Sequence, residues 1–166
     1  MRTTLVAPPA APTVGPWTLE VEDWTPGAQP WQTEVTTRTV ELAALAAWTT
    51  IPGLEDVSGI GRYATTVTAP ADWRDDVGAW LDLGVTFDTV RVTLNGERLP
   101  AVSPLVTRID LGAGLRPGRN SLVVEVTTTL FNRLRTTHPS VFGKSSRQAY
   151  GLIGPVTVQP YREATI

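Results

Sequence analysis

The sequence predicts an all-β fold, a two-sheet β-sandwich or jelly roll, and three observations lead to it. Val90–Leu94 alternates apolar and polar residues, and this period of two is typical of strands with one buried face. Asn95-Gly96 follows at once, and this dipeptide favours the type I′ turn of a hairpin. Similar short segments recur about every 8–12 residues, as in sandwiches and jelly rolls.

The expected strands share this alternation or a high content of valine and threonine. In chain order they are residues 17–22, 33–40, 58–68, 81–83, 90–94, 105–111, 121–126 and 156–158. Pro117-Gly118 supplies a turn before the seventh.

Two segments depart from this pattern. Glu41–Trp48 is the one helix-like segment, because Leu42, Leu45 and Trp48 recur at helical spacing, and it is expected to cap an open end of the sandwich or to form a single turn. Thr129–Ala149 has no clear period, and loops of this length in a compact domain are usually functional or mobile.

Length, charge and composition restrict the class of protein. A chain of 166 residues fits one domain, expected over residues 16–166 after a Pro/Ala-rich linker at residues 1–15. The net charge of −2 and the lack of a basic block argue against nucleic acid as a partner. No apolar run reaches the roughly 20 residues of a membrane span. The absence of cysteine excludes disulfides and thiolate metal sites.

No arrangement of acids or histidine predicts catalysis by this chain alone. The acidic clusters Glu55-Asp56, Asp75-Asp76 and Glu20–Asp23 lie beside one another in sequence and are expected to form solvated faces. Glycoside hydrolysis instead needs two carboxyl groups that face each other across a sugar. His138 is the only histidine, and no Gly-x-Ser-x-Gly motif is present to accompany it. We therefore expect no catalytic residues.

No cofactor is expected, with one alternative left open. Calcium sites use carboxylate and carbonyl oxygens and leave weak sequence signatures. The loop that carries Asp72, Asp75 and Asp76 is the candidate for a structural calcium ion.

The tryptophans are the residue type that bears on ligand binding, because sugars stack their C–H faces on aromatic rings. Trp17, Trp48 and Trp80 lie in or beside apolar patterns and are expected in the core. Trp24, Trp31 and Trp73 lie in expected loops, where each either packs across an end of the sandwich, serves as a sugar platform or contacts another domain. Tyr150 beside the long loop has the same alternatives.

The order of the motifs resembles a known family. The residues that carry the resemblance are Trp48 with Ile51, Ser58-Gly59 to Arg62-Tyr63, Leu81–Gly84, Val90–Gly96, Pro117–Asn120 before Leu122–Val126, Asn132-Arg133 and Gly151–Val156. The chain is similar to the galactose-binding-like jelly roll that accompanies glycoside hydrolases of the β-galactosidase and β-glucuronidase type. It resembles more closely the β-sandwich domain of bacterial α-L-rhamnosidase-like enzymes.

The resemblance implies a setting more than a chemistry, because in that family the catalytic acids lie in a separate barrel. We therefore expect a non-catalytic accessory domain of a glycoside hydrolase, which binds carbohydrate or packs on a catalytic domain of the same polypeptide. A stand-alone lectin-like protein is the alternative, and an extracellular or periplasmic location is implied. The residues expected to bind carbohydrate are Trp31, Trp73, Asn132, Arg133 and Tyr150, of which Asn132 and Arg133 match the family's polar pair and could instead tie down the loop backbone.

Overall fold

A computed structural model describes residues 9–100 and 107–162, and it confirms the all-β sandwich. The strands are β1 (Thr13–Val14), β2 (Trp17–Pro26), β3 (Thr33–Leu42), β4 (Gly59–Ala69), β5 (Val77–Asp82), β6 (Val85–Thr86), β7 (Thr89–Leu94), β8 (Glu97–Arg98), β9 (Arg108–Gly112), β10 (Gly118–Thr127), β11 (Leu152–Gly154) and β12 (Thr157–Arg162). The helical elements are the 3-10 turn η1 (Trp48–Thr50) and the short helices α1 (Phe131–Thr137) and α2 (Pro139–Phe142).

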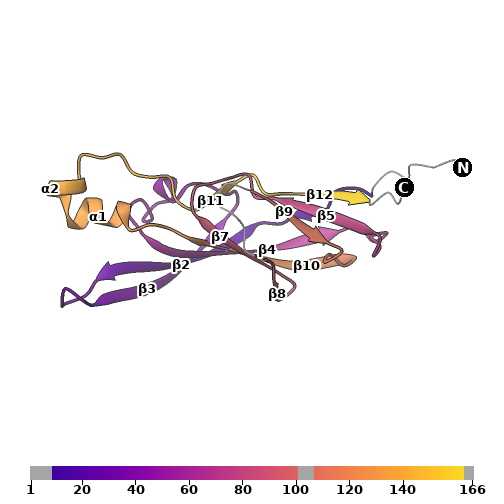
Figure 1. Cartoon of the computed structure of the whole chain (residues 1–166), viewed down its shortest axis with the longest axis horizontal. Coiled ribbons are helices and arrows are strands. Elements are labelled where there is room, and N and C mark those ends of the chain that lie inside the picture. Colours follow the sequence, from indigo (N-terminus) through magenta and orange to yellow (C-terminus); the bar gives the residue numbers. More distant parts are fainter. Residues whose placement is uncertain (1–8, 101–106, 163–166) are drawn as a thin grey trace, which may run out of the picture.

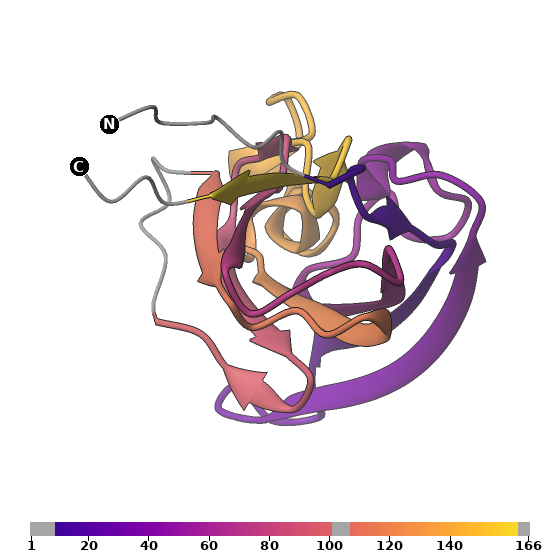
Figure 2. The same cartoon turned by 90° about the vertical axis from the view of Figure 1, so that its right-hand side faces the viewer.

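The strands form one large curved sheet and a smaller one opposite it. The large sheet has the order β3-β2-β4-β10-β7-β8, and β1 also pairs with β4. The opposing sheet has the order β12-β5-β9, and β11 pairs with β6 beside it. All pairs between these strands are antiparallel. Figure 2 shows the large sheet curving around the interior, with β12 and β5 across from it.

The core lies between the sheets and is built from the apolar phase of the alternating strands. Leu19, Tyr63, Val124 and Leu81 come from four different strands, and none of them is exposed to solvent. Removing such side chains from water is the main force that holds two sheets together. The strands identified by alternation are therefore the ones that form the core.

The hairpin between β7 and β8 has the predicted turn. Asn95 and Gly96 have φ angles of 51° and 82°, which is the left-handed conformation that a type I′ turn requires at both central positions. The Asn95 amide also donates to the Asn120 side chain at 2.9 Å, so this turn is tied to the start of β10. The prediction of a hairpin here is confirmed.

Two segment-level expectations differ from the structure. The helix-like character expected for Glu41–Trp48 is wrong over most of its length, because Leu42 is the last residue of β3 and residues 43–47 are bends and irregular chain; a single 3-10 turn, η1, begins only at Trp48. The helical spacing of the three apolar side chains arises because the chain crosses the open edge of the sandwich, where Leu45 packs against the core. Trp80, expected in the core, is half-buried and contacts the Tyr161 ring and the Arg108 guanidinium.

Several expected boundaries also differ from the observed ones. Thr13–Val14, inside the range expected to be a linker, pairs with β4, whereas residues 1–8 lie outside the described residues. The strand expected at residues 105–111 is described from residue 107 onward, and β9 begins at Arg108. Trp24, expected in a loop, lies within β2 because this strand continues to Pro26.

The two ends of the sandwich differ. Figure 1 shows α1, α2 and the turn between β2 and β3 at one end, and β12 near the other. We call the first the helical end. Within the described residues, no helix is long and apolar enough to cross a membrane.

Candidate functional site

The structure separates the five residues expected to bind carbohydrate into three groups. Asn132, Arg133 and Tyr150 come together around α1 at the helical end (Figure 1). Trp31 lies in the turn between β2 and β3 at the same end. Trp73 is buried in the loop between β4 and β5. Only the first four residues therefore belong to one region.

Asn132 and Tyr150 hold the long loop in place. The Asn132 amide donates to the Gln148 carbonyl at 2.8 Å and accepts from the Gln148 backbone N–H at 2.9 Å. The Tyr150 hydroxyl accepts from the Asn132 backbone N–H at 3.3 Å and lies 2.6 Å from the Thr129 hydroxyl. Asn132 is fully buried and Tyr150 is 2% exposed, so both side chains are occupied inside the protein. Their arrangement is that of residues that tie down the loop backbone.

Arg133 takes part in a second, ionic network. Its guanidinium donates to Asp23, and Arg38 contacts the other oxygen of the same carboxylate at 3.1 Å. Asp23 is 6% exposed, so a buried carboxylate binds one largely buried arginine, Arg133, and one partly exposed arginine, Arg38. The Arg133 backbone N–H also donates to the Ser58 hydroxyl at 3.2 Å. Arg133 thus joins α1 to β2 and to the start of β4.

Asp56 forms a neighbouring ion pair. Arg147 donates to both of its carboxylate oxygens, at 2.7 and 2.8 Å, and Arg135 approaches at 3.4 Å. The hydrogen bond from Arg147 lowers the pKa of Asp56, against the opposing effect of partial burial. This carboxylate therefore stays ionised and cannot serve as a general acid near neutral pH.

Trp31 is the candidate whose ring reaches solvent. Its turn is closed by a hydrogen bond from the Gly27 N–H to the Gln32 carbonyl at 2.9 Å, and Gln32 also accepts from the Gln29 N–H through its side chain. Trp31 is 80% exposed, so both faces of the indole can meet a ligand or another protein surface. Gln29 and Gln32 lie in the same turn as Trp31.

Trp73 does not present a ring face, and the expectation that it binds carbohydrate is wrong. The side chain is 3% exposed and belongs to the hydrophobic core. The loop turns inward at this residue, where the Trp73 N–H donates to the Pro70 carbonyl at 3.1 Å. The polar neighbours in the sequence remain exposed and gave no sign of this burial.

This difference gives a direct prediction. Replacing Trp73 by alanine should lower the free energy of unfolding by about 3–5 kcal/mol, because the substitution leaves a cavity in the core. Replacing Trp31 by alanine should change it by less than about 0.5 kcal/mol, since that side chain is mainly in solvent. Urea denaturation followed by circular dichroism measures both. Equal losses for the two variants would contradict the placement of these rings.

Asp88 is a buried group that the sequence analysis missed. It is 7% exposed, and its carboxylate accepts from the Gly151 N–H at 2.8 Å. Burial raises the pKa of Asp88 to about 6, with the hydrogen bond from Gly151 opposing the shift. Asp88 stands just before β7 in a segment without a recognisable motif, so no sequence signal marked it. Its contact with a backbone N–H indicates a role in positioning the loop.

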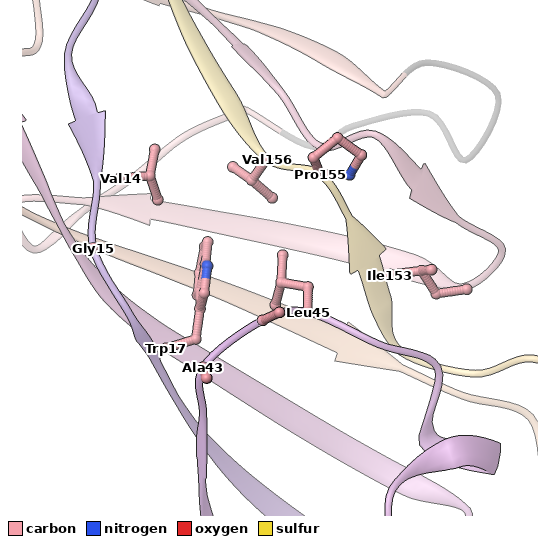
Figure 3. Close-up of a pocket in the computed structure, with 9 residues that line it drawn as sticks. Val14, Gly15, Trp17, Ala43, Leu45, Ile153, Pro155 and Val156 are labelled. Carbon is pink, nitrogen blue, oxygen red and sulfur yellow. The ribbon is translucent and has the colours of Figure 1, made fainter.

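An apolar hollow opens between β1, the start of β2, the segment after β3, and β11 (Figure 3). Its volume is about 420 Å³, and Trp17 and Leu45 both line it. The other lining residues are Val14, Gly15, Ala43, Ala44, Ile153, Pro155 and Val156. None of these has a polar side-chain group apart from the Trp17 indole, so the hollow lacks the side-chain partners that sugar hydroxyls require.

The loop named above as the alternative calcium site does not form a cluster of acids in the described residues. Among residues 9–100 and 107–162, no group of three or more His, Cys, Asp or Glu side chains is placed to hold a metal ion. Asp72, Asp75 and Asp76 are all exposed. These carboxylates therefore do not converge on one point.

No protein-family model and no curated protein matches the sequence. Solved structures do match. A rhamnosidase from Novosphingobium sp. PP1Y is 26% identical, with a TM-score of 0.68 over 96% of this chain and 16% of that chain. An FMN-binding β-glucuronidase from Facaelibacterium prausnitzii L2-6 is 18% identical, with a TM-score of 0.53 over 91% of this chain and 23% of that chain. A Ruminococcus gnavus β-glucuronidase is 20% identical, with a TM-score of 0.52 over 70% of this chain and 20% of that chain.

These matches share the fold and a limited extent. The chain spans only 16% to 23% of the length of these three enzymes. The glucuronidases show a similar fold alone, and the rhamnosidase extends the likeness over nearly the whole chain. The chain is thus a β-sandwich related in structure to a domain-sized part of glycoside hydrolases.

Proposed function

We propose that this chain is a non-catalytic accessory domain of a glycoside hydrolase of the α-L-rhamnosidase-like type, with a galactose-binding-like jelly-roll topology. The observation that carries the proposal is the match to the rhamnosidase, which covers 96% of this chain and 16% of that chain. The matched region is therefore a small part of the rhamnosidase, and most of that enzyme lies outside it. The proposal places the protein outside the cytoplasm, where polymeric glycans are degraded.

The chemistry of the described residues supports a non-catalytic role. A glycosidase needs two carboxyl groups on either side of a substrate, one with a raised pKa. Asp88 has a raised pKa, but it is buried and bonded to the backbone of Gly151. Asp23 and Asp56 are each held by two arginines. These carboxylates are committed to structure.

An activity assay tests the proposal directly. The purified chain should release no aryl alcohol from an aryl α-L-rhamnoside or an aryl β-D-glucuronide beyond the rate in buffer. Circular dichroism must show the same sample to be folded. Turnover that disappears on replacing Asp88 by asparagine would show that the chain is itself a glycosidase and would overturn the proposal.

Carbohydrate binding is the more specific candidate role, and the exposure of Trp31 favours it. An 80% exposed indole on a closed turn offers a preformed stacking surface, and Arg133 at the same end keeps its side chain 19% exposed. Asn132 and Tyr150 would act indirectly, by fixing α1 and the loop that precedes β11. Packing of the same surface on a catalytic domain is the competing role.

A fluorescence titration distinguishes these two roles. If Trp31 stacks on a sugar, titration with rhamnose, galactose, glucuronic acid or a pectic oligosaccharide should give a saturable change in tryptophan emission. The change should be lost in the Trp31→Ala variant and kept in a Val141→Ala variant, since Val141 is also exposed, at 71%, and lies on α2. No change with any of these sugars would leave packing as the supported role.

A saturable response retained without Trp31 would place the sugar elsewhere. Tight sugar binding by the purified chain, without any catalytic domain, would favour the alternative of a stand-alone lectin-like protein.

A further inference from the structure

The outer strand β3 is a long sheet edge. It spans 10 residues, Thr33–Leu42, and stands at the end of the large sheet. Within the described residues, β2 is the strand that pairs with it. Residues 33–39 are all exposed, and Figure 1 shows the β2–β3 hairpin projecting from the body of the sandwich. The edge is therefore open to another chain.

The register of the hairpin identifies which backbone groups are unused. The Gly27 N–H donates to the Gln32 carbonyl, so Gly27 and Gln32 form a hydrogen-bonded pair. Every second pair after it is of the same kind, and Asp23 opposite Thr36 is one of them. In an antiparallel pair, only every second residue exchanges hydrogen bonds with its partner strand. The intervening residues of β3 thus point their N–H and C=O groups away from β2. These are Thr33, Val35, Thr37, Thr39 and Glu41.

This edge lacks most of the features that usually prevent pairing, and its charges are the exception. Natural edge strands are protected by proline, charged side chains and above all lysine, bulges or short length. β3 contains no proline, lysine or glycine, and its register against β2 is continuous from Thr33 to Leu42. Threonine and valine dominate its sequence and favour extended backbone. Such an edge is suited to receive an additional strand.

The charges of β3 match those of a second, antiparallel copy of itself. If Thr36 stands opposite Thr36 of the second copy, Glu34 stands opposite Arg38 of that copy, and the pair occurs twice by symmetry. Glu34 has no ion pair or side-chain hydrogen bond within the described residues. Arg38 bonds Asp23 and the Gly53 carbonyl, yet its side chain remains 42% exposed. Opposite charges across such a pair stabilise it, whereas like charges would repel.

The same arrangement satisfies the unused backbone. With Thr36 on the two-fold axis, Val35 stands opposite Thr37, and both belong to the set whose N–H and C=O groups point outward. In this register the outward N–H and C=O groups of one β3 strand meet the outward C=O and N–H groups of the other, as an antiparallel ladder requires. It also covers Val35, which is 50% exposed on the isolated chain.

We propose that two copies of this chain associate through β3, pairing antiparallel about Thr36 to join their large sheets into one. This interaction surface goes beyond the proposed accessory role and does not depend on sugar binding or on activity. Its symmetric form is the commonest one for a homodimer.

Sedimentation velocity of the full chain over a range of concentrations tests the association. We expect a reversible monomer–dimer equilibrium. Thr37→Pro should abolish it, because proline removes an outward N–H but no bond to β2. Glu34→Lys should weaken it about tenfold or more, by placing lysine opposite Arg38 of the second copy. Denaturation curves must show both variants to be folded, and Glu41→Lys serves as the charge control outside the central pairs.

Cysteine cross-linking tests the register independently of affinity. The chain has no cysteine, so a single substitution gives a clean readout. Thr36→Cys should form a disulfide-linked dimer under mild oxidation, because self-opposed residues in a non-hydrogen-bonded pair have Cα atoms about 4.5 Å apart. Thr39→Cys, which would face Thr33 of the second copy, should cross-link much more slowly.

The outcomes separate clearly. A dimer that is lost in Thr37→Pro, with cross-linking at Thr36→Cys, supports the proposal. A chain that remains monomeric at all concentrations overturns it, and so does a dimer unaffected by Thr37→Pro. Preferential cross-linking at Thr37→Cys would mean a different register and would overturn the pairing of Glu34 with Arg38. Failure of a sugar to bind would not affect any of these results.

Discussion

Replacing Asp88 by asparagine is expected to remove a pH dependence of stability between about pH 4 and pH 6. Burial raises the pKa of Asp88 to about 6 from a reference value of 3.8. Between these two values the folded protein holds a proton that the unfolded chain has released, so the free energy of unfolding falls as pH rises. Above about pH 6 the loss is complete, because the carboxylate is then ionised in both states.

The size of this effect follows from the shift. Each pKa unit corresponds to 1.36 kcal/mol, so the ionised group costs about 3 kcal/mol above pH 6 compared with below pH 4. Asparagine is neutral at both pH values and keeps an oxygen that can accept from the Gly151 N–H. The difference in free energy of unfolding between variant and wild type should therefore increase by about 3 kcal/mol from pH 4 to pH 8.

Urea denaturation at the two pH values measures this difference. Asp88→Ala serves as the matched variant, because it removes the acceptor together with the charge. It should show the same pH dependence as Asp88→Asn and be less stable at each pH, since the Gly151 N–H loses its partner. If the wild type and Asp88→Asn change in parallel between pH 4 and pH 8, the carboxylate does not have the raised pKa described here.

Replacing Asp23 by alanine should lower the free energy of unfolding by about 3–5 kcal/mol. Asp23 is 6% exposed and binds both Arg133 and Arg38. Removing one partner of a buried ion pair leaves the other charge without compensation, which costs far more than the pair itself contributes. The cost falls mainly on Arg133 and less on Arg38. The Arg133 side chain is 19% exposed, and its Nε is already buried without a hydrogen-bond partner in the described residues.

A double variant distinguishes the cost of an unpaired buried charge from the cost of lost packing. Asp23→Ala combined with Arg133→Met should be more stable than Asp23→Ala alone, because neither charge is then buried unpaired. Asp76→Ala is the control for an exposed pair: Asp76 lies 4.0 Å from Arg162 with its side chain 65% exposed, and its loss should cost less than about 1 kcal/mol. Additive losses for Asp23→Ala and Arg133→Met would show that the two side chains do not depend on each other.

The fold was predictable because its signals are local. The alternation in Val90–Leu94 reports which side chains face the core, and Asn95-Gly96 reports a backbone conformation that few other residues adopt. The segment around Leu45 was wrongly expected to be helix-like because it was judged from the same kind of local signal. Its apolar spacing is local, but the chain uses those side chains to cover the sandwich edge in an extended path.

The candidate site was only partly predictable because its contacts join distant residues. Asp23 and Arg133 are 110 positions apart, and no spacing rule connects them. The pairing of the Asn132 amide with the backbone of Gln148 is equally invisible, since any residue at position 148 could provide those groups. Trp73 was misplaced because its exposed polar neighbours hide a turn toward the core.

The placement of the first and last strands has a consequence for how such a fold is exchanged among proteins. β1 and β12 contact each other, while the helical end lies away from β12 (Figure 1). A domain whose entry and exit strands are neighbours can be inserted into another polypeptide without separating its sheets. Recombination could therefore transfer this sandwich between unrelated hosts as a unit. The same geometry suits laboratory fusion, because a reporter joined beside β12 would leave Trp31 and α1 unobstructed.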